Sequence, residues 1–458
     1  MKSTYKNALF PRLRRKPRAQ ILMYSLYTLV FRAVLSYTPK KITIFKGTLM
    51  QLGHPWFTGL VLLFVVLGVF PAWASDSEWD LSGNTALQLR GFSQDALWPG
   101  QNTSDAEVSV SGEWEARWRS EEGDQRGSFI PFARWDENDD ERTHIDLREA
   151  YWANEGLSYK GTKIELLVGI NKVFWGVTES AHLVDIINQT DLVEDIDQED
   201  KLGQPMVNLA LQHDWGLVNV YLLPYFRERT FPGRDGRFRS PLPVDWDDAE
   251  YESGAEEKHM DFALRYSHYF GDVDIGAYYF RGTSREPRLE IASNGRELTP
   301  FYDQIDQVGL DVQYTRDAWL WKLEALLRDG YDESFMATVA GFEYTFYQVY
   351  ESNADIGMLM EYQYDDRSSQ EPITTADNDV FLGARWSMND TQDTALLAGV
   401  VVDKDTSETF FNIEAERRIG DNVVVELRVR AITNAESDES LYSFNQDDYI
   451  QLQISRFF

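Results

Sequence analysis

The sequence predicts an all-β protein: a transmembrane antiparallel β-barrel of about 18 strands, with an acidic third extracellular loop folded into the lumen. From Trp79 onward, polar and apolar residues alternate as they do in strands with one polar and one apolar face. The connections between these stretches alternate between short turns and long polar segments. No segment after Ala74 approaches the run of about 18 apolar residues that marks a membrane-spanning helix.

The distribution of charge divides the chain into two parts. The 458 residues carry a formal net charge of −31, yet residues 1–74 contain no Asp or Glu. Residues 59–70 form an apolar run shorter than the roughly 20 residues that span a bilayer, and the small residues Ala72 and Ala74 follow it. We therefore predict an N-terminal leader and signal peptide in residues 1–74, cleaved after Ala74, and a barrel in residues 75–458. The alternatives are a retained anchor helix and a later translation start, at Met23 or Met50.

Residues 107–119 show why strands are expected. Val108, Val110 and Trp118 fall on one face of an extended chain, and Glu107 and Ser109 fall on the other. A helix would scatter these two sets around its circumference, whereas a strand separates them. The same alternation predicts strands at 307–314, 319–328, 380–387, 423–431 and 449–458.

The connections are expected to sort by length. Short turns are predicted around 215–216, 271–272, 316–317, 351–353, 389–390 and 420–421, and longer connections near 93–104, 174–203, 229–256, 284–301, 365–378 and 433–445. In outer-membrane barrels the short turns face the periplasm and the long loops face outward. An even number of strands places both termini in the periplasm, and about 16 is the alternative count.

The last strand and the aromatic residues agree with this class. Ile450, Leu452 and Ile454 share one face of a strand that ends on Phe458, and this resembles the C-terminal strand by which outer-membrane barrels are recognised for insertion. A soluble β-sandwich or propeller is the alternative, but its loops would not sort by length. We expect the outer membrane of a Gram-negative bacterium, with membrane lipid and lipopolysaccharide around the barrel. Aromatic residues that fit interfacial girdles stand at Trp118, Trp135, Trp152, Tyr344 and Trp386.

Residues 162–201 interrupt the alternation. A strand-like stretch at 163–169 is followed by Phe174-Trp175-Gly176 and then by a long acidic excursion. Together with Leu147-Arg148-Glu149-Ala150 and the Asp185–Asn188 segment, this stretch resembles a family of large proteobacterial outer-membrane proteins of the DUF1302 type. The resemblance spans residues 147–192 and implies a porin-like barrel without naming a solute. The chain departs from the family pattern at Ile170, Val177 and Gln189, where the family has arginine, an acid and proline.

The candidate functional residues are those expected to line the bore. We expect an arginine ladder on the pore wall at Arg117, Arg119, Arg148, Arg227, Arg265, Arg328, Arg385, Arg428 and Arg430. The inserted loop is expected to form the constriction through Asp185, Asn188, Asp191, Glu194, Asp195, Asp197, Glu199 and Asp200. Trp175 and Gly176 are expected to anchor the loop, and Asn188 to cap or turn its backbone. Acids facing arginines across a narrow gap would orient charged or dipolar solutes.

Each of these features has a simpler alternative. An acidic loop is often only a solvated loop, and a lumenal arginine often pairs with a neighbouring acid, as Arg428 would with Glu426 or Glu414. The first functional hypothesis is a channel for diffusion of polar or amphipathic small solutes. The second is a plugged barrel, a docking component that passes a lipid or hydrophobic compound to or from a periplasmic partner. Apolar inward residues beside the loop, such as Phe129, Tyr278 or Phe280, would favour the second.

Other classes of function lack their signatures. The chain contains no His-Glu-x-x-His, Gly-x-Ser-x-Gly or glycine-rich phosphate loop, so no enzyme, catalytic residue or cofactor is expected. The loop at 229–256 lacks the aspartate spacing of a calcium loop, so no metal is expected, although ions bridging lipopolysaccharide remain an alternative. The absence of cysteine excludes a disulfide framework. The strong negative charge argues against nucleic acid as a partner.

Overall fold

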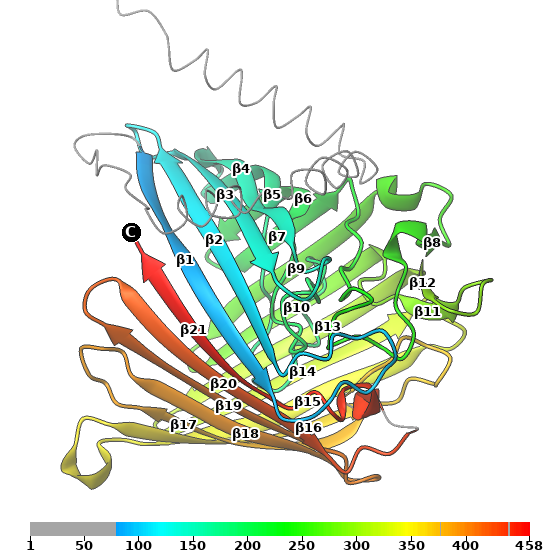
Figure 1. Cartoon of the computed structure of the whole chain (residues 1–458). Coiled ribbons are helices and arrows are strands. Elements are labelled where there is room, and N and C mark those ends of the chain that lie inside the picture. Colours follow the sequence, from blue (N-terminus) through cyan, green and yellow to red (C-terminus); the bar gives the residue numbers. More distant parts are fainter. Residues whose placement is uncertain (1–78, 376, 438–439) are drawn as a thin grey trace, which may run out of the picture. The chain divides into compact units, whose positions relative to one another are not determined.

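The computed structural model describes residues 79–458, except residue 376 and residues 438–439. Within these residues, eighteen antiparallel strands form one sheet that closes on itself where β1 (Trp79–Phe92) pairs with β21 (Tyr449–Phe457), Leu89 lying opposite Leu452 (Figure 1). The prediction of 18 strands is therefore confirmed. The predicted leader in residues 1–74 and its cleavage after Ala74 lie outside the described residues.

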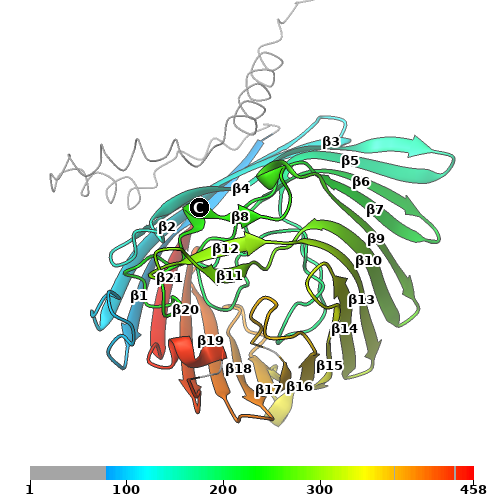
Figure 2. The same ribbon diagram turned by 90° about the vertical axis from the view of Figure 1, so that its right-hand side faces the viewer.

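The first half of the barrel follows the order of the chain. Its strands are β2 (Ala106–Arg119), β3 (Gln125–Asp136), β4 (His144–Tyr159), β5 (Thr162–Asn171), β6 (Gln204–His213), β7 (Gly216–Leu223), β9 (Asp261–Phe270) and β10 (Val273–Thr283). Each pairs with its neighbour in an antiparallel register (Figure 2). The ladder shifts register beside Pro131, where the missing N–H interrupts pairing with β4.

The second half continues in the same way to the closing strand. Its strands are β13 (Gln304–Arg316), β14 (Trp319–Asp329), β15 (Phe335–Phe346), β16 (Asp355–Asp365), β17 (Asn378–Ser387), β18 (Ala395–Asp403), β19 (Thr409–Ile419) and β20 (Val423–Thr433). A separate three-stranded sheet is formed within the long connections by β8 (Glu250–Tyr251), β11 (Arg288–Ile291) and β12 (Leu298–Tyr302).

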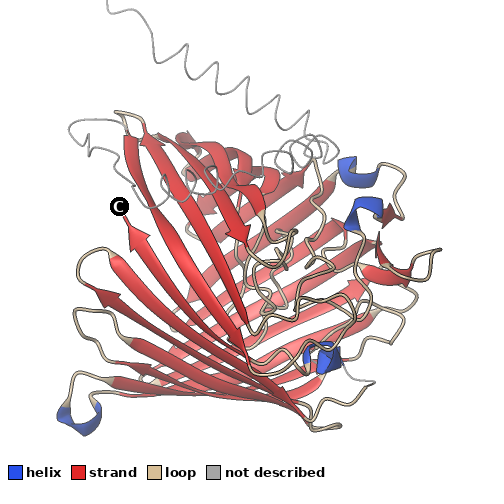
Figure 3. Ribbon diagram, in the orientation of Figure 1, coloured by secondary structure: helices blue, strands red, loops and turns tan. Residues whose placement is uncertain are grey.

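Helical structure in the described residues is confined to short 3₁₀ turns between strands (Figure 3). They are η2 (Trp246–Asp248), η3 (Glu256–Lys258), η4 (Val349–Glu351) and η5 (Ser440–Phe444). Among the residues that the structure describes, no helix has the length and apolar character needed to cross a membrane.

The two ends of the barrel differ as predicted. Short turns such as 271–272 and 317–318 join strands at one end, and the connections 172–203, 224–260 and 284–303 lie at the other. The sorting is not complete, because 330–334 and 404–408 at the second end are also short. We call these the turn end and the loop end.

Alternation sets the two faces of the wall. Leu87 and Leu89 are exposed on the outer face, whereas Gln88 and Arg90 are 6% and 3% exposed on the inner face. Val110 pairs in register with Leu87 and therefore shares the outer face. The wall is thus apolar outside and largely polar inside, because successive side chains of a strand point to opposite faces. Phe129 is exposed outside, so it does not line the bore, whereas Tyr278 and Phe280 are buried inside.

Candidate functional site

The connection between β5 and β6, residues 172–203, is the third at the loop end and runs inside the ring of strands (Figures 1 and 2). We call it the inserted loop. Asn188 closes its base, because its Oδ1 accepts the Val173 N–H at 2.8 Å while its Nδ2 donates to the Asn171 and Leu202 carbonyls at 3.0 and 2.8 Å. One buried amide therefore ties the outgoing and returning chains together.

An apolar foot packs the inserted loop against the wall. The Trp175 ring lies 5.7 Å from that of Tyr221 and 5.1 Å from that of Tyr278. Val184 and Ile187 of the loop are fully buried in the same cluster as Phe280. Burial of apolar area favours association. This cluster therefore holds the loop against the strands that carry Tyr221, Tyr278 and Phe280.

Gly176 follows Trp175 with a φ of +155°, a conformation that L side chains rarely adopt. A Cβ at this position would lie 3.1 Å from Oε1 of Glu324. Glycine thus allows the loop backbone to approach the wall of β14 closely.

Two wall carboxylates bind the inserted loop through its backbone. Oε1 of Glu324 accepts the N–H groups of Val177 and Thr178 at 2.6 and 3.0 Å, and Oε2 accepts that of Val184 at 3.2 Å. Glu361 on β16 likewise accepts the N–H groups of Glu179 and Ser180. Alternation places both glutamates inward, but their partners are main-chain groups that no side-chain pattern reveals.

The far part of the loop is held by ion pairs to the wall. Asp191 lies 2.6 Å from Arg148, Glu194 2.6 Å from Arg134, and Asp195 2.6 Å from Arg430. All six side chains are at most 7% exposed. Burial alone would raise the pKa of Asp195, but Arg430, Arg90 and Arg428 hold it below its usual range. Asp191, Glu194 and Asp195 are therefore ionised and neutralised by arginines in place.

Other predicted loop acids do not face wall arginines, which corrects that expectation. The Asp185 side chain is 1% exposed and lies 3.8 Å from Lys201, and burial raises its pKa to about 6. Glu199 is more than half exposed and pairs with His182 at 3.2 Å. Asp200 is exposed. The alternation of the wall fixes where arginines point, but not which part of a loop reaches them.

The predicted wall arginines fall into groups. Arg148, Arg385, Arg428 and Arg430 pair with acids of the inserted loop, the last two sharing Asp195 and Asp197. Arg265 and Arg328 pair with Asp311 and Glu286, and Arg117 and Arg119 are about 60% exposed near the turn end, beside Glu115 and Glu155.

One assignment is wrong in detail, and one simpler alternative does not hold. Arg227 lies beyond the end of β7, so it belongs to a connection rather than to a strand, and it pairs with Asp146 at 2.7 Å. Arg428 contacts Asp195 at 3.0 Å, and it is Arg430 that contacts Glu414, at 3.2 Å. The loop acids displace the cross-strand pair that a bare wall would form.

Sequence reasoning missed several inner residues. Arg134 binds Glu194, and Arg90 pairs with Glu107 at 3.2 Å. Both alternate with outward residues, so a period-two reading of the strands 79–92 and 125–136 would have placed them inside. Arg142 lies in the short connection 137–143, where periodicity gives no signal, and it pairs with Asp136 at 2.6 Å.

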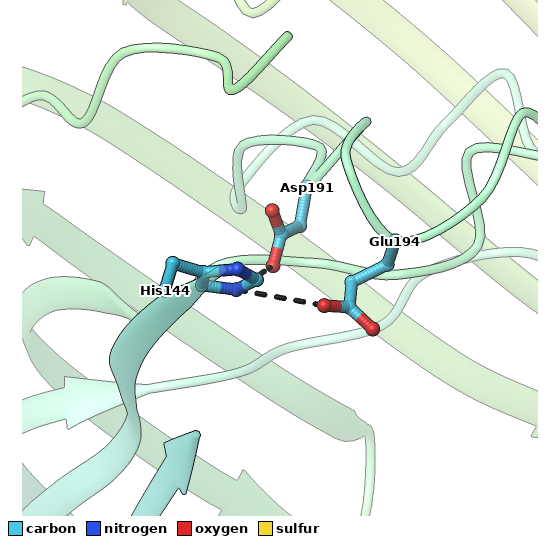
Figure 4. Close-up of side chains that lie close together, drawn as sticks. All are labelled: His144, Asp191 and Glu194. Atoms are coloured by element: carbon cyan, nitrogen blue, oxygen red, sulfur yellow. Dashed lines mark ion pairs between the residues drawn. The ribbon is translucent and has the colours of Figure 1, made fainter. Parts of the chain in front are cut away.

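His144, Asp191 and Glu194 lie together where the loop meets the wall (Figure 4). Nε2 of His144 is 3.7 Å from Asp191 and 3.5 Å from Glu194. One ligand atom from each side chain lies within 4.8 Å of the others, a spacing that could suit a cation. Arg148 and Arg134 already neutralise the two carboxylates, however, so the local charge opposes a divalent ion.

A cavity of about 850 Å³ remains beside the inserted loop. Ile196 and Asp197 line it from the loop, and β17–β20 line it from the wall. Arg229 and Glu286, from the connections 224–260 and 284–303, line it as well. The volume falls in the range of about 300–1,000 Å³ typical of small-molecule sites.

The similarity of this chain to known proteins is low. No protein-family model matches the chain, and no curated protein matches it. Among solved structures, a mutant of the Rh. blastica porin is 12% identical and a structure titled "Asymmetric conductivity of engineered proteins" is 11% identical; each match covers 83% of this chain and 100% of the other, with a TM-score of 0.39. Acinetobacter baumannii OccAB3 is 9% identical over 83% of this chain and 99% of its own, with a TM-score of 0.46. Similarities this low assign no solute.

Proposed function

We propose that this protein is an outer-membrane, porin-like channel through which polar or amphipathic small solutes diffuse. The observation that carries the proposal is a closed barrel whose interior is narrowed, on one side, by a loop held in place by ion pairs. The proposal includes no catalysis and no cofactor.

The outer face of the wall supports a position in a membrane. Apolar residues such as Leu327 and Leu382 are exposed there, about half of each side chain lying open. The rings of Trp319 and Tyr344 meet edge to face near the turn end, with their centroids 4.7 Å apart, as in an interfacial aromatic girdle. An outer membrane would supply the lipid and lipopolysaccharide that such a surface requires.

The interior supports permeation with selectivity. Asp197 and Arg430 bring both signs of charge to the lining of the cavity. Fields between opposed charges are strong where the walls have a low dielectric constant. Polar solutes would therefore be oriented during passage.

Liposome swelling tests the proposal. Liposomes containing the purified full-length protein should swell in solutions of small sugars and amino acids faster than protein-free liposomes, and more slowly as solute size increases. Swelling no faster than in protein-free liposomes, from a barrel shown to be folded by its resistance to protease, would contradict diffusion.

The alternative is a plugged barrel that docks a periplasmic partner and passes a lipid or hydrophobic compound. The apolar foot favours it, because Tyr278 and Phe280 point inward and pack against the loop. The same swelling experiment separates the two functions, since a plugged barrel would be folded and impermeable.

A further inference from the structure

Part of the inner face of three adjacent strands is apolar. Phe381 on β17 lies opposite Val401 on β18, and Val401 lies opposite Phe410 on β19. Leu397 lies on the same inward face of β18, two residues before Gly399. These four side chains form a continuous strip that we call the apolar strip (β17–β19 in Figure 2).

Two glycines leave room for the Phe381 ring of the apolar strip to lie against the wall. An added Cβ at Gly399 would lie 2.5 Å from the Phe381 ring, and one at Gly383 would lie 2.7 Å from it. The ring therefore rests over two positions without side chains. All four members of the strip line the cavity of about 850 Å³, so the inserted loop leaves them open to it.

An arginine without a carboxylate partner lines the same cavity. Nε of Arg229 donates to Gln189 at 3.4 Å, and among the described residues no carboxylate lies within ion-pair distance of the guanidinium. Its backbone N–H donates to the Tyr302 hydroxyl at 2.9 Å, which fixes the position of the residue. Burial lowers the pKa of Arg229, yet an arginine remains a cation at neutral pH.

Most acids of the cavity already have basic partners. Asp197 and Glu414 pair with Arg430, and Glu286 pairs with Arg328 at 2.7 Å. Glu179 pairs with Arg385 and Glu199 pairs with His182, whereas Glu371 accepts the Ser368 N–H at 2.6 Å and has no basic partner among the described residues. The lining residue Arg239 also has no carboxylate within ion-pair distance, but its guanidinium donates to the backbone carbonyls of Arg234, Ser240, Pro241 and Pro99. Arg229 is thus the lining arginine whose guanidinium has neither a carboxylate nor a full set of acceptors among the described residues.

We propose that this cavity selects small amphipathic anions, holding one carboxylate at Arg229 and an apolar body against the apolar strip. The inference rests on the proposed channel function, because it treats the cavity as a binding site along the permeation path and names the class of solute that binds there. A carboxylate completes the hydrogen bonding of the guanidinium, and a chain of several methylenes buries apolar area at about 0.8 kcal/mol per methylene.

Isothermal titration of the purified full-length protein with octanoate, acetate and 1-octanol tests the proposal. Octanoate should bind at least about tenfold more tightly than either of the others, because only octanoate has both the charge and the chain. Arg229→Gln should weaken octanoate binding about tenfold or more, since a charge-assisted hydrogen bond is lost. Val401→Thr should weaken it several-fold by placing a hydroxyl in the apolar strip.

Two matched variants serve as controls. Arg418→Gln removes the same charge from an exposed arginine near the turn end, paired with Asp393. Val400→Thr makes the same change one residue away on the opposite, outer face of β18. Both should bind octanoate as the unaltered protein does, and partitioning of octanoate into detergent is the same for every variant.

The outcomes separate the two proposals. Octanoate binding no tighter than acetate binding, or equal binding by the Arg229→Gln variant, would overturn the selection of amphipathic anions even if liposomes swell. Selective binding that depends on Arg229, in a protein whose liposomes do not swell, would leave the binding site standing and contradict the channel.

Discussion

Ion pairs in this protein differ in how much water reaches them. Asp195 and Arg430 are each 2% exposed and lie 2.6 Å apart, whereas Arg117 is 61% exposed and lies 2.7 Å from Glu115. Similar geometry therefore occurs in two environments. A buried pair couples strongly, and breaking it leaves a charge without solvent, whereas an exposed pair is screened.

A double-mutant cycle should reveal this contrast. Asp195→Asn alone is expected to destabilise the barrel by about 3 kcal/mol, because the buried Arg430 loses its most buried carboxylate partner and keeps only Asp197 and Glu414. Adding Arg430→Gln should recover part of the loss, giving a coupling energy of about 2–3 kcal/mol in urea unfolding. The matched cycle with Arg117→Gln and Glu115→Gln should give less than about 1 kcal/mol. Equal coupling in both cycles would show that the loop pair is solvated.

Asp185 should contribute to the pH dependence of the inserted loop. Its pKa in the folded protein is about 6, above the ordinary value, so the docked loop binds a proton that the released loop does not. Docking is therefore favoured as pH falls through 6 and is weakened as pH rises. Between pH 8 and pH 5 the docked population should increase about tenfold relative to the released one.

Hydrogen exchange of the loop amides at the two pH values measures this effect. The Asp185→Asn variant imitates the protonated side chain and should be as protected at pH 8 as the unaltered protein is at pH 5. Protection that rises with pH in the unaltered protein would contradict the assignment to Asp185.

At the scale of residues, the alternation of polar and apolar residues predicted which side chains point into the barrel, but not which groups they bind there. Arg148, Arg385 and Arg430 were placed inside correctly because the period of a strand is two. Arg428 contacts the loop residue Asp195 and not Glu426 or Glu414 of the neighbouring strand positions, a choice that depends on the path of a loop far earlier in the chain. The uncompensated charge of Arg229 was missed because it lies in a connection, where no period indicates which side chains face the lumen.

At the scale of elements, the inserted loop behaves as a unit with three attachments: the amide clamp of Asn188, the apolar foot and the ion pairs. Between the foot and the pairs, Glu324 and Glu361 accept loop N–H groups. A buried N–H that loses its acceptor costs about 1–3 kcal/mol. The wall carboxylates therefore determine how closely the loop approaches β14 and β16.

Replacing Glu324 should loosen the loop without opening the barrel. Glu324→Ala leaves the N–H groups of Val177, Thr178 and Val184 without their acceptor, so exchange at these amides should accelerate at least about tenfold. Amides of β14 and β15 should remain protected. The control Glu416→Ala removes an exposed glutamate of β19 and should change neither set. Unchanged loop exchange in the Glu324→Ala variant would show that the foot and the ion pairs suffice.

The strands were predictable because each has to present one apolar face to its surroundings over its whole length. The sorting of connections by length gave the two ends of the barrel. Neither the alternation of the strands nor the lengths of the connections indicates how a long loop is packed. The contacts of the apolar foot, in which Val184 and Ile187 are fully buried, could therefore not be predicted from the sequence. The acidic composition of the loop suggested an electrostatic contact and concealed an apolar one.

At the scale of the whole molecule, closure between β1 and β21 pairs every strand of the wall, so no strand edge is left free. The fold can then carry a polar interior and an apolar exterior at once. The proposed channel requires that residues 183–200 occupy the lumen and neutralise arginines of the wall.

The most direct test is the single-channel conductance of the full chain in a planar bilayer under a salt gradient, compared with that of a variant lacking residues 183–200. We expect a stable open conductance that increases in the shortened variant. We also expect a reversal potential that moves toward anions, because Arg134, Arg148, Arg428 and Arg430 lose their carboxylates. Equal conductance and equal reversal potential in the two proteins would contradict this expectation.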